Sequence, residues 1–172
     1  MIELKIEKMY DDVIMPEYMQ LGDAGFDIHC YLYDNEEDEK IKSIKIWPNS
    51  SAKIHTGIKT SFPHGYSLEL VPRGSMGIKK NLMLMNTIGI VDSEFDQEIL
   101  LFVYNYGNEP VEILHQERLV QGMLKKCEEV KIVQVDKIDK TERGAGFGSS
   151  NYDKDGKYIL WNIGAKKKMN LL

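Results

Sequence analysis

The sequence predicts an all-β fold, and two features carry that prediction. Apolar residues alternate with polar ones in short runs, which is the period of a β-strand with one solvated face. Turn-forming residues interrupt these runs, for example at 62–65 (FPHG) and 105–110 (NYGNEP). We therefore expect a distorted barrel of short, mostly antiparallel strands. The alternating runs are Ile2, Leu4 and Ile6; Ile54, Thr56, Ile58 and Thr60; and Leu68 and Leu70.

Three segments depart from simple alternation. Residues 99–104 (ILLFVY) are apolar on both faces, as expected of a strand that is covered on both sides or packed against another subunit. This strand should lie at the centre of the core. The best helical candidate is a turn or two from Ser75 to Lys80. Residues 34–39 contain five acids in six positions and should form a solvated loop.

The size and charge of the chain exclude several classes of protein. With 172 residues, 42% apolar and 28% charged, the chain suits one globular domain. It has no run of about 20 apolar residues, so a membrane span is not expected. A net charge of −5 argues against general binding to nucleic acid. The first residues lack a secretion signal and the two cysteines lack metal-ligand spacing, which favours a reduced, cytoplasmic protein.

Five motifs fall in order along the chain. Residues 23–28 (DAGFDI) and 71–80 (VPRGSMGIKK) could each be an ordinary turn. Residues 86–99 (NTIGIVDSEFDQEI) are the most specific motif, whereas 117–121 (ERLVQ) has the alternation of a half-buried strand. Residues 143–150 (RGAGFGSS) are rich in Gly and Ser, which is typical of a flexible linker.

In this order the five motifs resemble those of the homotrimeric dUTP pyrophosphatases (dUTPases), over about residues 5–150. The resemblance implies a distorted jelly-roll-like β-barrel (β-clip) over residues 1–142. It also implies a mobile active-site arm over 143–151 that is exchanged between the subunits of a homotrimer. The implied reaction is Mg²⁺-dependent hydrolysis of dUTP to dUMP and pyrophosphate. Residues 152–172 would be a C-terminal extension with a hairpin at Asp155 and Gly156.

The resemblance also implies which residues hold the nucleotide. Residues 86–99 would form a β-hairpin that accepts the base and the sugar. Its backbone groups near Ile90 and Val91, together with Asn86, would read the edge of uracil in a pocket too close for the methyl group of thymine. Phe95 would stack under deoxyribose and reject a 2′-hydroxyl group. The full expected substrate-binding set is Gly74, Asn86, Ile90, Val91, Phe95, Leu100, Arg143, Phe147, Gly148 and Ser149.

For the chemical step, the resemblance assigns Asp92 to position and deprotonate the attacking water. Arg73, Ser75 and Gln121, helped by Arg143 of the arm, would offset the charge that builds on the leaving pyrophosphate. Asp27 would orient a water molecule on Mg²⁺, a cation that favours oxygen ligands.

Departures from the family pattern leave alternatives open. Gly74 stands where the family has serine, Gln97 replaces a glycine, and the arm has one residue fewer before Phe147. Gly74 permits a second hypothesis, in which the chain is a catalytically weakened dUTP-binding regulatory or interaction protein that exposes its acidic loop and C-terminal hairpin to a regulatory protein partner. A dCTP deaminase is less favoured, because residues 100–102 (LLF) lack the glutamate that proton transfer would need there.

Other conspicuous residues are expected to be structural. Cys30 and Cys127 lie in apolar strand patterns and should be buried. Met83 and Met85 should lie in the core. Zinc binding is not expected, because the histidines lack the spacing of a metal site; they are His29, His55, His64 and His115.

Overall fold

The computed structural model describes residues 2–34, 39–139, 155 and 157. In that part of the chain α1 is the one helix and the other regular elements are strands, so the predicted all-β fold is confirmed. The elements are β1 (Lys5–Lys8), β2 (Phe26–His29), β3 (Tyr33–Asp34), β4 (Glu39–Lys40), β5 (Ser43–Ile46), β6 (Ser51–His55), β7 (Ile58–Ser61), β8 (Tyr66–Pro72), α1 (Gly74–Lys80), β9 (Leu82–Leu84), β10 (Gly89–Asp92), β11 (Leu100–Asn105), β12 (Val111–Leu114) and β13 (Arg118–Lys126).

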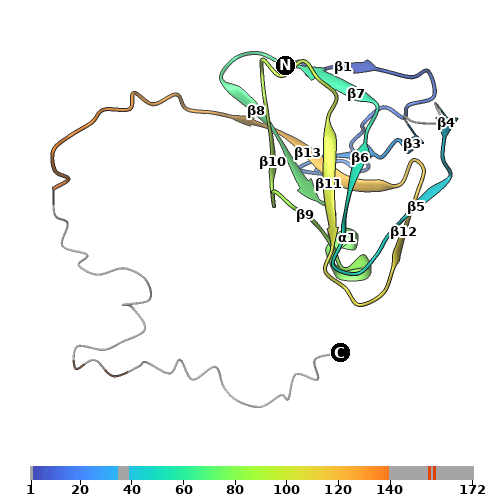
Figure 1. Cartoon of the computed structure of the whole chain (residues 1–172). Coiled ribbons are helices and arrows are strands. Elements are labelled where there is room, and N and C mark those ends of the chain that lie inside the picture. The colour runs from blue at the N-terminus through green and yellow to red at the C-terminus, as the bar shows by residue number, and fades with distance from the viewer. Residues whose placement is uncertain (1, 35–38, 140–154, 156, 158–172) are drawn as a thin grey trace. The chain divides into compact units, whose positions relative to one another are not determined.

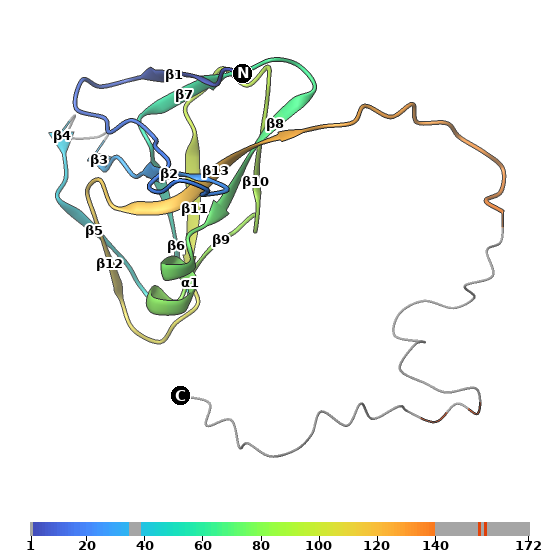
Figure 2. The same ribbon diagram turned by 180° about the vertical axis from the view of Figure 1, so that it is seen from behind.

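The strands form one larger antiparallel sheet and several smaller ones. The larger sheet has the order β10-β8-β13-β2, and a second sheet has the order β6-β11-β9. The remaining strands pair as β1 with β7, β5 with β12, and β3 with β4. In Figures 1 and 2 the β1–β7 pair lies at one end of the barrel and α1 at the other, with β8 running between them.

The core follows the alternation of the strands. On β11, Leu101 and Val103 are buried, whereas Phe102 between them is 47% exposed. The expectation that this strand is covered on both faces therefore does not hold within one chain. Its outer face is an apolar surface that a single copy leaves open.

A sharp corner divides the predicted run from Ile54 to Thr60 into β6 and β7. Gly57 lies at this corner with a φ of 68°, a conformation that costs glycine little. A Cβ atom at this position would come within 2.7 Å of the Val13 side chain. The corner therefore requires glycine for both its backbone conformation and its packing.

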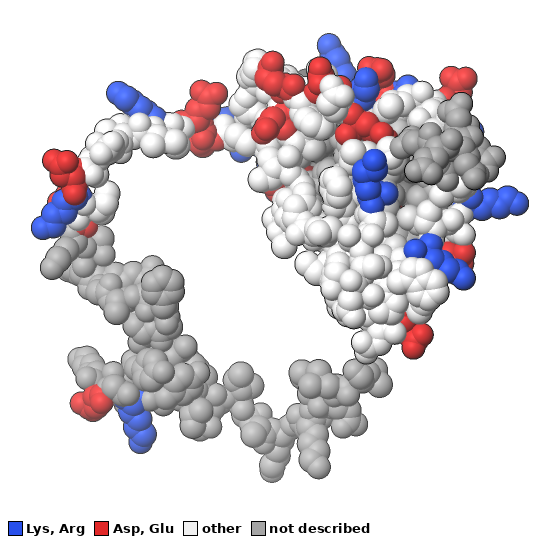
Figure 3. Space-filling view, viewed as in Figure 1, with Lys and Arg blue, Asp and Glu red and all other residues white. Residues whose placement is uncertain are grey.

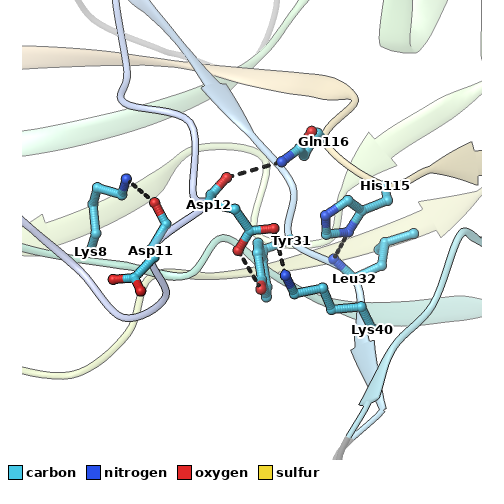
Figure 4. A network of polar contacts seen from close by, with 8 residues as sticks. All are labelled: Lys8, Asp11, Asp12, Tyr31, Leu32, Lys40, His115 and Gln116. Carbon is cyan, nitrogen blue, oxygen red and sulfur yellow. Dashed lines mark hydrogen bonds and ion pairs between the residues drawn. The ribbon is translucent and has the colours of Figure 1, made fainter.

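A polar network ties the N-terminal segment to the rest of the barrel (Figure 4). The Asp12 carboxylate accepts a hydrogen bond from the Tyr31 hydroxyl at 3.0 Å and pairs with Lys40 at 2.6 Å. Gln116 donates to the backbone carbonyl of Asp12 at 3.0 Å. The hydrogen bond from Lys40 lowers the pKa of Asp12, so the carboxylate stays ionised well into mildly acidic solution.

The predicted helical turn is confirmed as α1. Arg73 precedes it with extended backbone, and Asn81 ends it in the left-handed conformation with a φ of 53°. Lys79 and Lys80 occupy the last turn, where positive charge complements the helix dipole. The motif at 71–80 therefore forms a strand end, an arginine and a short helix.

Three expectations about burial were wrong. Cys127 is exposed, and Met83 and Met85 are 37% and 55% exposed. On β9 the neighbouring Leu82 and Leu84 point inward instead. Cys30 is buried as predicted, and burial raises the pKa of its thiol to about 12.

The chain divides into two compact units, Met1–Val130 and Lys131–Leu172, and the described strands and helix all belong to the first. Residues 131–139 of the second unit contain no strand or helix. The arm at 143–151, most of the extension at 152–172 and the centre of the acidic loop lie outside the described residues. In the described part of the chain, no helix has the length and apolar character of a membrane span.

Candidate active site

A pocket gathers the described residues that the sequence assigned to the base and sugar. Its cavity has a volume of about 190 Å³. For comparison, an engineered apolar cavity of about 150 Å³ can bind benzene, so the pocket has the size for one six-membered ring. It is lined by Asn86, Ile90, Val91, Phe95 and Leu100 from the predicted set, and by Leu70, Gly89, Glu98, Ile99 and Phe102.

The walls of the pocket come from two different sheets. The third motif was expected to form a β-hairpin, but β10 pairs with β8, whereas β11 pairs with β6 and β9. Phe102 accepts a backbone hydrogen bond from Met85 at 2.9 Å on the β9 side. In an antiparallel strand the backbone groups of every second residue point to the same side, so the N–H and C=O of Leu100 point to the β9 side as those of Phe102 do. Pairing with β9 covers Val103 to Asn105, and Leu100 lies beyond it. Its backbone groups are therefore placed to bond a ligand in the pocket.

A second group of predicted residues surrounds Asp27 on β2. The Asp27 side chain is only 3% exposed. One of its oxygens lies 3.0 Å from Arg73 Nε, and the other accepts a hydrogen bond from Arg118 at 3.2 Å. Gln121 of β13 lies directly opposite Asp27 in the strand register. The first, second and fourth motifs thus meet at one end of the larger sheet.

Three ionic side chains contact one another in this cluster, and one carboxylate and two guanidinium groups leave them a net charge of +1 (−1 + 2). The Glu17 carboxylate also acts on the neighbouring His29. His29 pairs with Arg118 across β2 and β13. Burial, and then the positive charge of Arg118, lower the pKa of His29, so it is neutral near pH 7. The cluster is therefore suited to an anion.

A model of the dUTPase family matches residues 11–151, which include all five motifs. The chain belongs to the dUTPase family.

Curated relatives agree with this assignment to the dUTPases. A deoxyuridine 5'-triphosphate nucleotidohydrolase of Nautilia profundicola is 32% identical over 150 residues, covering 87% of this chain and 99% of its own length. One of Fusobacterium nucleatum is 34% identical over 139 residues, covering 80% and 90%. Neither relative is described as a deaminase or a regulator, so the two alternative hypotheses are not favoured.

Solved dUTPases share the fold. A variant of the dUTPase of Staphylococcus bacteriophage 80alpha, solved with dUpNHpp, aligns with a TM-score of 0.71 at 20% identity, over 86% of this chain and 98% of its own. A variant of the phage phi11 dUTPase, described as coordinating a structural Mg(II) ion, aligns with a TM-score of 0.68 at 18% identity, over 80% and 99%. At these identities the likeness establishes the dUTPase fold.

The surroundings of Asp27 do not suit a magnesium ion bound by its carboxylate. Both carboxylate oxygens already face guanidinium groups, which would repel a cation. Among the described residues, no three His, Cys, Asp or Glu side chains are grouped to hold a metal. In this arrangement a magnesium ion would need its ligands from substrate phosphates and water.

Asp92 and the Asp27 cluster lie at opposite ends of β8. Asp92, at the end of β10, lies opposite Ser67, whereas Arg73 follows the other end of β8. Arg73 follows Ser67 by six positions, which is about 20 Å along the strand at about 3.3 Å per residue. One dUTPase chain therefore does not bring Asp92 next to Arg73.

The structure also shows the surroundings of Gly74 and Ser75, where the sequence departs from the dUTPase pattern. Ser75 is exposed on α1. A Cβ atom built on Gly74 would meet no other atom within 4 Å. The turn therefore has room for the serine that the dUTPase pattern has at this position.

Two residues near the sites were not assigned a role there from sequence. Glu98 lines the pocket. Its position near the end of the third motif was the feature of the sequence that could have indicated a role there. Arg118 binds Asp27 from 91 positions away along the chain. Arg143, Phe147, Gly148 and Ser149 lie outside the described residues.

Proposed function

We propose that this chain is a dUTP diphosphatase, which hydrolyses dUTP to dUMP and pyrophosphate. The observation that carries the proposal is the ring-sized pocket, around which five predicted nucleotide-binding residues gather. The curated relatives, more than 30% identical, support the same substrate.

The pocket accounts for recognition of the base and the sugar. The free backbone groups of Leu100 and the side chain of Asn86 supply hydrogen bonds for the edge of uracil. Phe95, which is 40% exposed, offers a flat apolar wall to deoxyribose. A ribose 2′-hydroxyl against that wall would lose its water without gaining a partner, which disfavours UTP.

The Asp27 cluster accounts for the phosphates. Arg73 is 26% exposed, so it can face both Asp27 and a ligand, and Gln121 adds a neutral hydrogen-bonding group beside it. Ser75 would add a hydroxyl from α1, and Arg143 and Ser149 would come from the arm, with Phe147 and Gly148 over the base. Asp92 would accept the proton of the attacking water. Magnesium would arrive on the triphosphate.

The separation of Asp92 from Arg73 supports a site built between copies of the chain, as in a homotrimer. The uncharged face in Figure 3 lies over β9, β10 and β11. Exposed apolar side chains of β9, β10, β11 and the connection between β9 and β10 could be covered by another copy, since large exposed apolar surfaces usually mark interaction sites. They are Met83, Met85, Ile88, Ile90 and Phe102.

The cysteines support a location in the cytoplasm. Cys30 and Cys127 are both free thiols, which is usual for proteins of reducing compartments and unusual for secreted ones.

Turnover of three nucleotides tests the proposal. We expect pyrophosphate from dUTP, little product from UTP, and no ammonia from dCTP. Ammonia from dCTP would indicate a deaminase. Binding of dUTP with no product at any enzyme concentration would indicate a binding protein instead. Size-exclusion chromatography at the assay concentration tests the trimer, and a catalytically active monomer would contradict assembly between copies.

A further inference from the structure

Glu98 is held at the edge of the pocket by three hydrogen bonds. One of its carboxylate oxygens accepts from the backbone N–H groups of Thr56 and Gly57, at 3.2 and 2.8 Å. The other lies 2.7 Å from Nδ1 of His55. The Glu98 and His55 side chains are only 14% and 18% exposed. Although Glu98 lines the pocket, its oxygens already have partners within the protein.

The residue that follows Glu98 is fixed to the same corner. The backbone N–H of Ile99 donates to Ile58 at 3.0 Å, and the Ile99 carbonyl accepts from the Thr56 hydroxyl at 2.6 Å. Five hydrogen bonds thus join residues 98–99 to the corner between β6 and β7. We call this group the Glu98 clamp.

The turn that the clamp closes has few other restraints. Asp92 begins the turn and is fixed by pairing of β10 with β8, and its carbonyl accepts a backbone hydrogen bond from Phe95 at 3.1 Å. Ser93 and Glu94 contact His64, but these side chains are exposed, and exposed contacts of this kind contribute little. Phe95 lies in this turn, and Leu100 follows the clamp directly. The clamp is therefore the main buried restraint on this wall of the pocket.

We propose that Glu98 is a positioning residue that sets the sugar-facing wall of the pocket, and so the preference for deoxyribose over ribose. The inference rests on the proposed dUTP hydrolysis. It requires Glu98 to act through Phe95 and Leu100, because its own oxygens are occupied. His55 can donate from Nδ1 in its neutral or its protonated form, so the clamp does not depend on the charge of the imidazole.

Three substitutions separate this role from a role in the chemistry. Glu98→Ala removes all three hydrogen bonds, and Glu98→Asp is one carbon too short to keep them all. Glu98→Gln keeps an oxygen for Thr56 and Gly57, and its amide can donate to His55 once that ring carries its proton on Nε2. Glutamine should therefore restore the clamp, whereas it could not replace a carboxylate that takes up a proton.

The first readout is the ratio of kcat/KM for dUTP to that for UTP. We expect this ratio to fall at least about tenfold in Glu98→Ala and Glu98→Asp, because a loosened wall forfeits discrimination that is typically worth about 10–200-fold. Glu98→Gln should remain close to the unsubstituted protein. Ile113→Val is the matched control, since Ile113 is buried on β12, outside the pocket lining. It should lower stability slightly and leave the ratio unchanged.

The second readout does not need activity. Amide hydrogen exchange of residues 93–102 without nucleotide should become faster in Glu98→Asp and Glu98→Ala, but not in Glu98→Gln or Ile113→Val. A Glu98→Gln protein as defective as Glu98→Ala would overturn the positioning role. Unchanged ratio and exchange in Glu98→Asp would overturn it as well. If the unsubstituted chain released no pyrophosphate from dUTP, the proposed function would fail, while the exchange data would still decide whether the clamp holds the wall.

Discussion

Replacing Asp27 with asparagine should lower the thermal stability of the protein even when no divalent cation is present. The amide has the size of the carboxylate but no charge, and its nitrogen would face a guanidinium group. Arg73 and Arg118 would then be left beside each other without the anion that joins them. Their mutual repulsion and lost hydrogen bonding should weaken the end of the larger sheet.

The magnitude follows from the burial of the three groups. Removing one partner of a buried ion pair costs about 3–5 kcal/mol. Arg73 and Arg118 are 26% and 36% exposed, so each can turn partly toward water, which favours the lower value. At about 3 kcal/mol, and about 2–4 °C per kcal/mol for a chain of this size, Tm should fall by about 6–12 °C.

Thermal unfolding followed by circular dichroism in EDTA, at one fixed protein concentration, measures this change. Asp23→Asn is the matched control, because Asp23 is exposed and its carboxylate accepts only a local hydrogen bond from Gln20 at 2.8 Å. Its Tm should stay near that of the unsubstituted chain. The reasoning would be refuted if Asp27→Asn kept its Tm in EDTA but needed more Mg²⁺ for activity, since Asp27 would then serve the metal.

Three further substitutions or labels test the remaining assignments. Asp92→Asn should fold and bind dUTP but lose about 10²-fold or more in kcat; near-normal turnover would remove Asp92 from the mechanism. Gly74→Ser has room for its side chain and should raise kcat with little change in Kd for dUTP. An unchanged kcat would mean that no donor is missing there. A thiol reagent at pH 8 should label exposed Cys127 quickly and Cys30, with its pKa of about 12, only after denaturation; rapid labelling of both would contradict the burial.

The base and sugar pocket could be predicted because its residues lie close together in the sequence. Asn86, Ile90 and Phe95 fall within one motif, Leu100 follows it directly, and a single turn brings them around the cavity. The order of the motifs and the alternation of the strands were enough to locate this part of the site. The same holds for α1, which lies within a single motif.

Contacts between distant strands could not be predicted in the same way. Residues 82–85 are all apolar, which is compatible with either face of β9 being buried, and Leu82 was found inside rather than Met83. The prediction of a hairpin at residues 86–99 was wrong for a similar reason, because local sequence does not specify that β10 pairs with β8. The bond between Arg118 and Asp27 depends on how β13 and β2 pair across the sheet.

The position of β8 has a genetic consequence. This strand is hydrogen-bonded on both edges, to β10 and to β13, so bending of one chain cannot close the gap between Arg73 and Asp92. If the reaction needs both residues, each chain serves one site with its arginine and another with its aspartate. Two alleles, one defective at each residue, would then complement each other in a mixed assembly. An allele that carries both defects would give an inactive assembly.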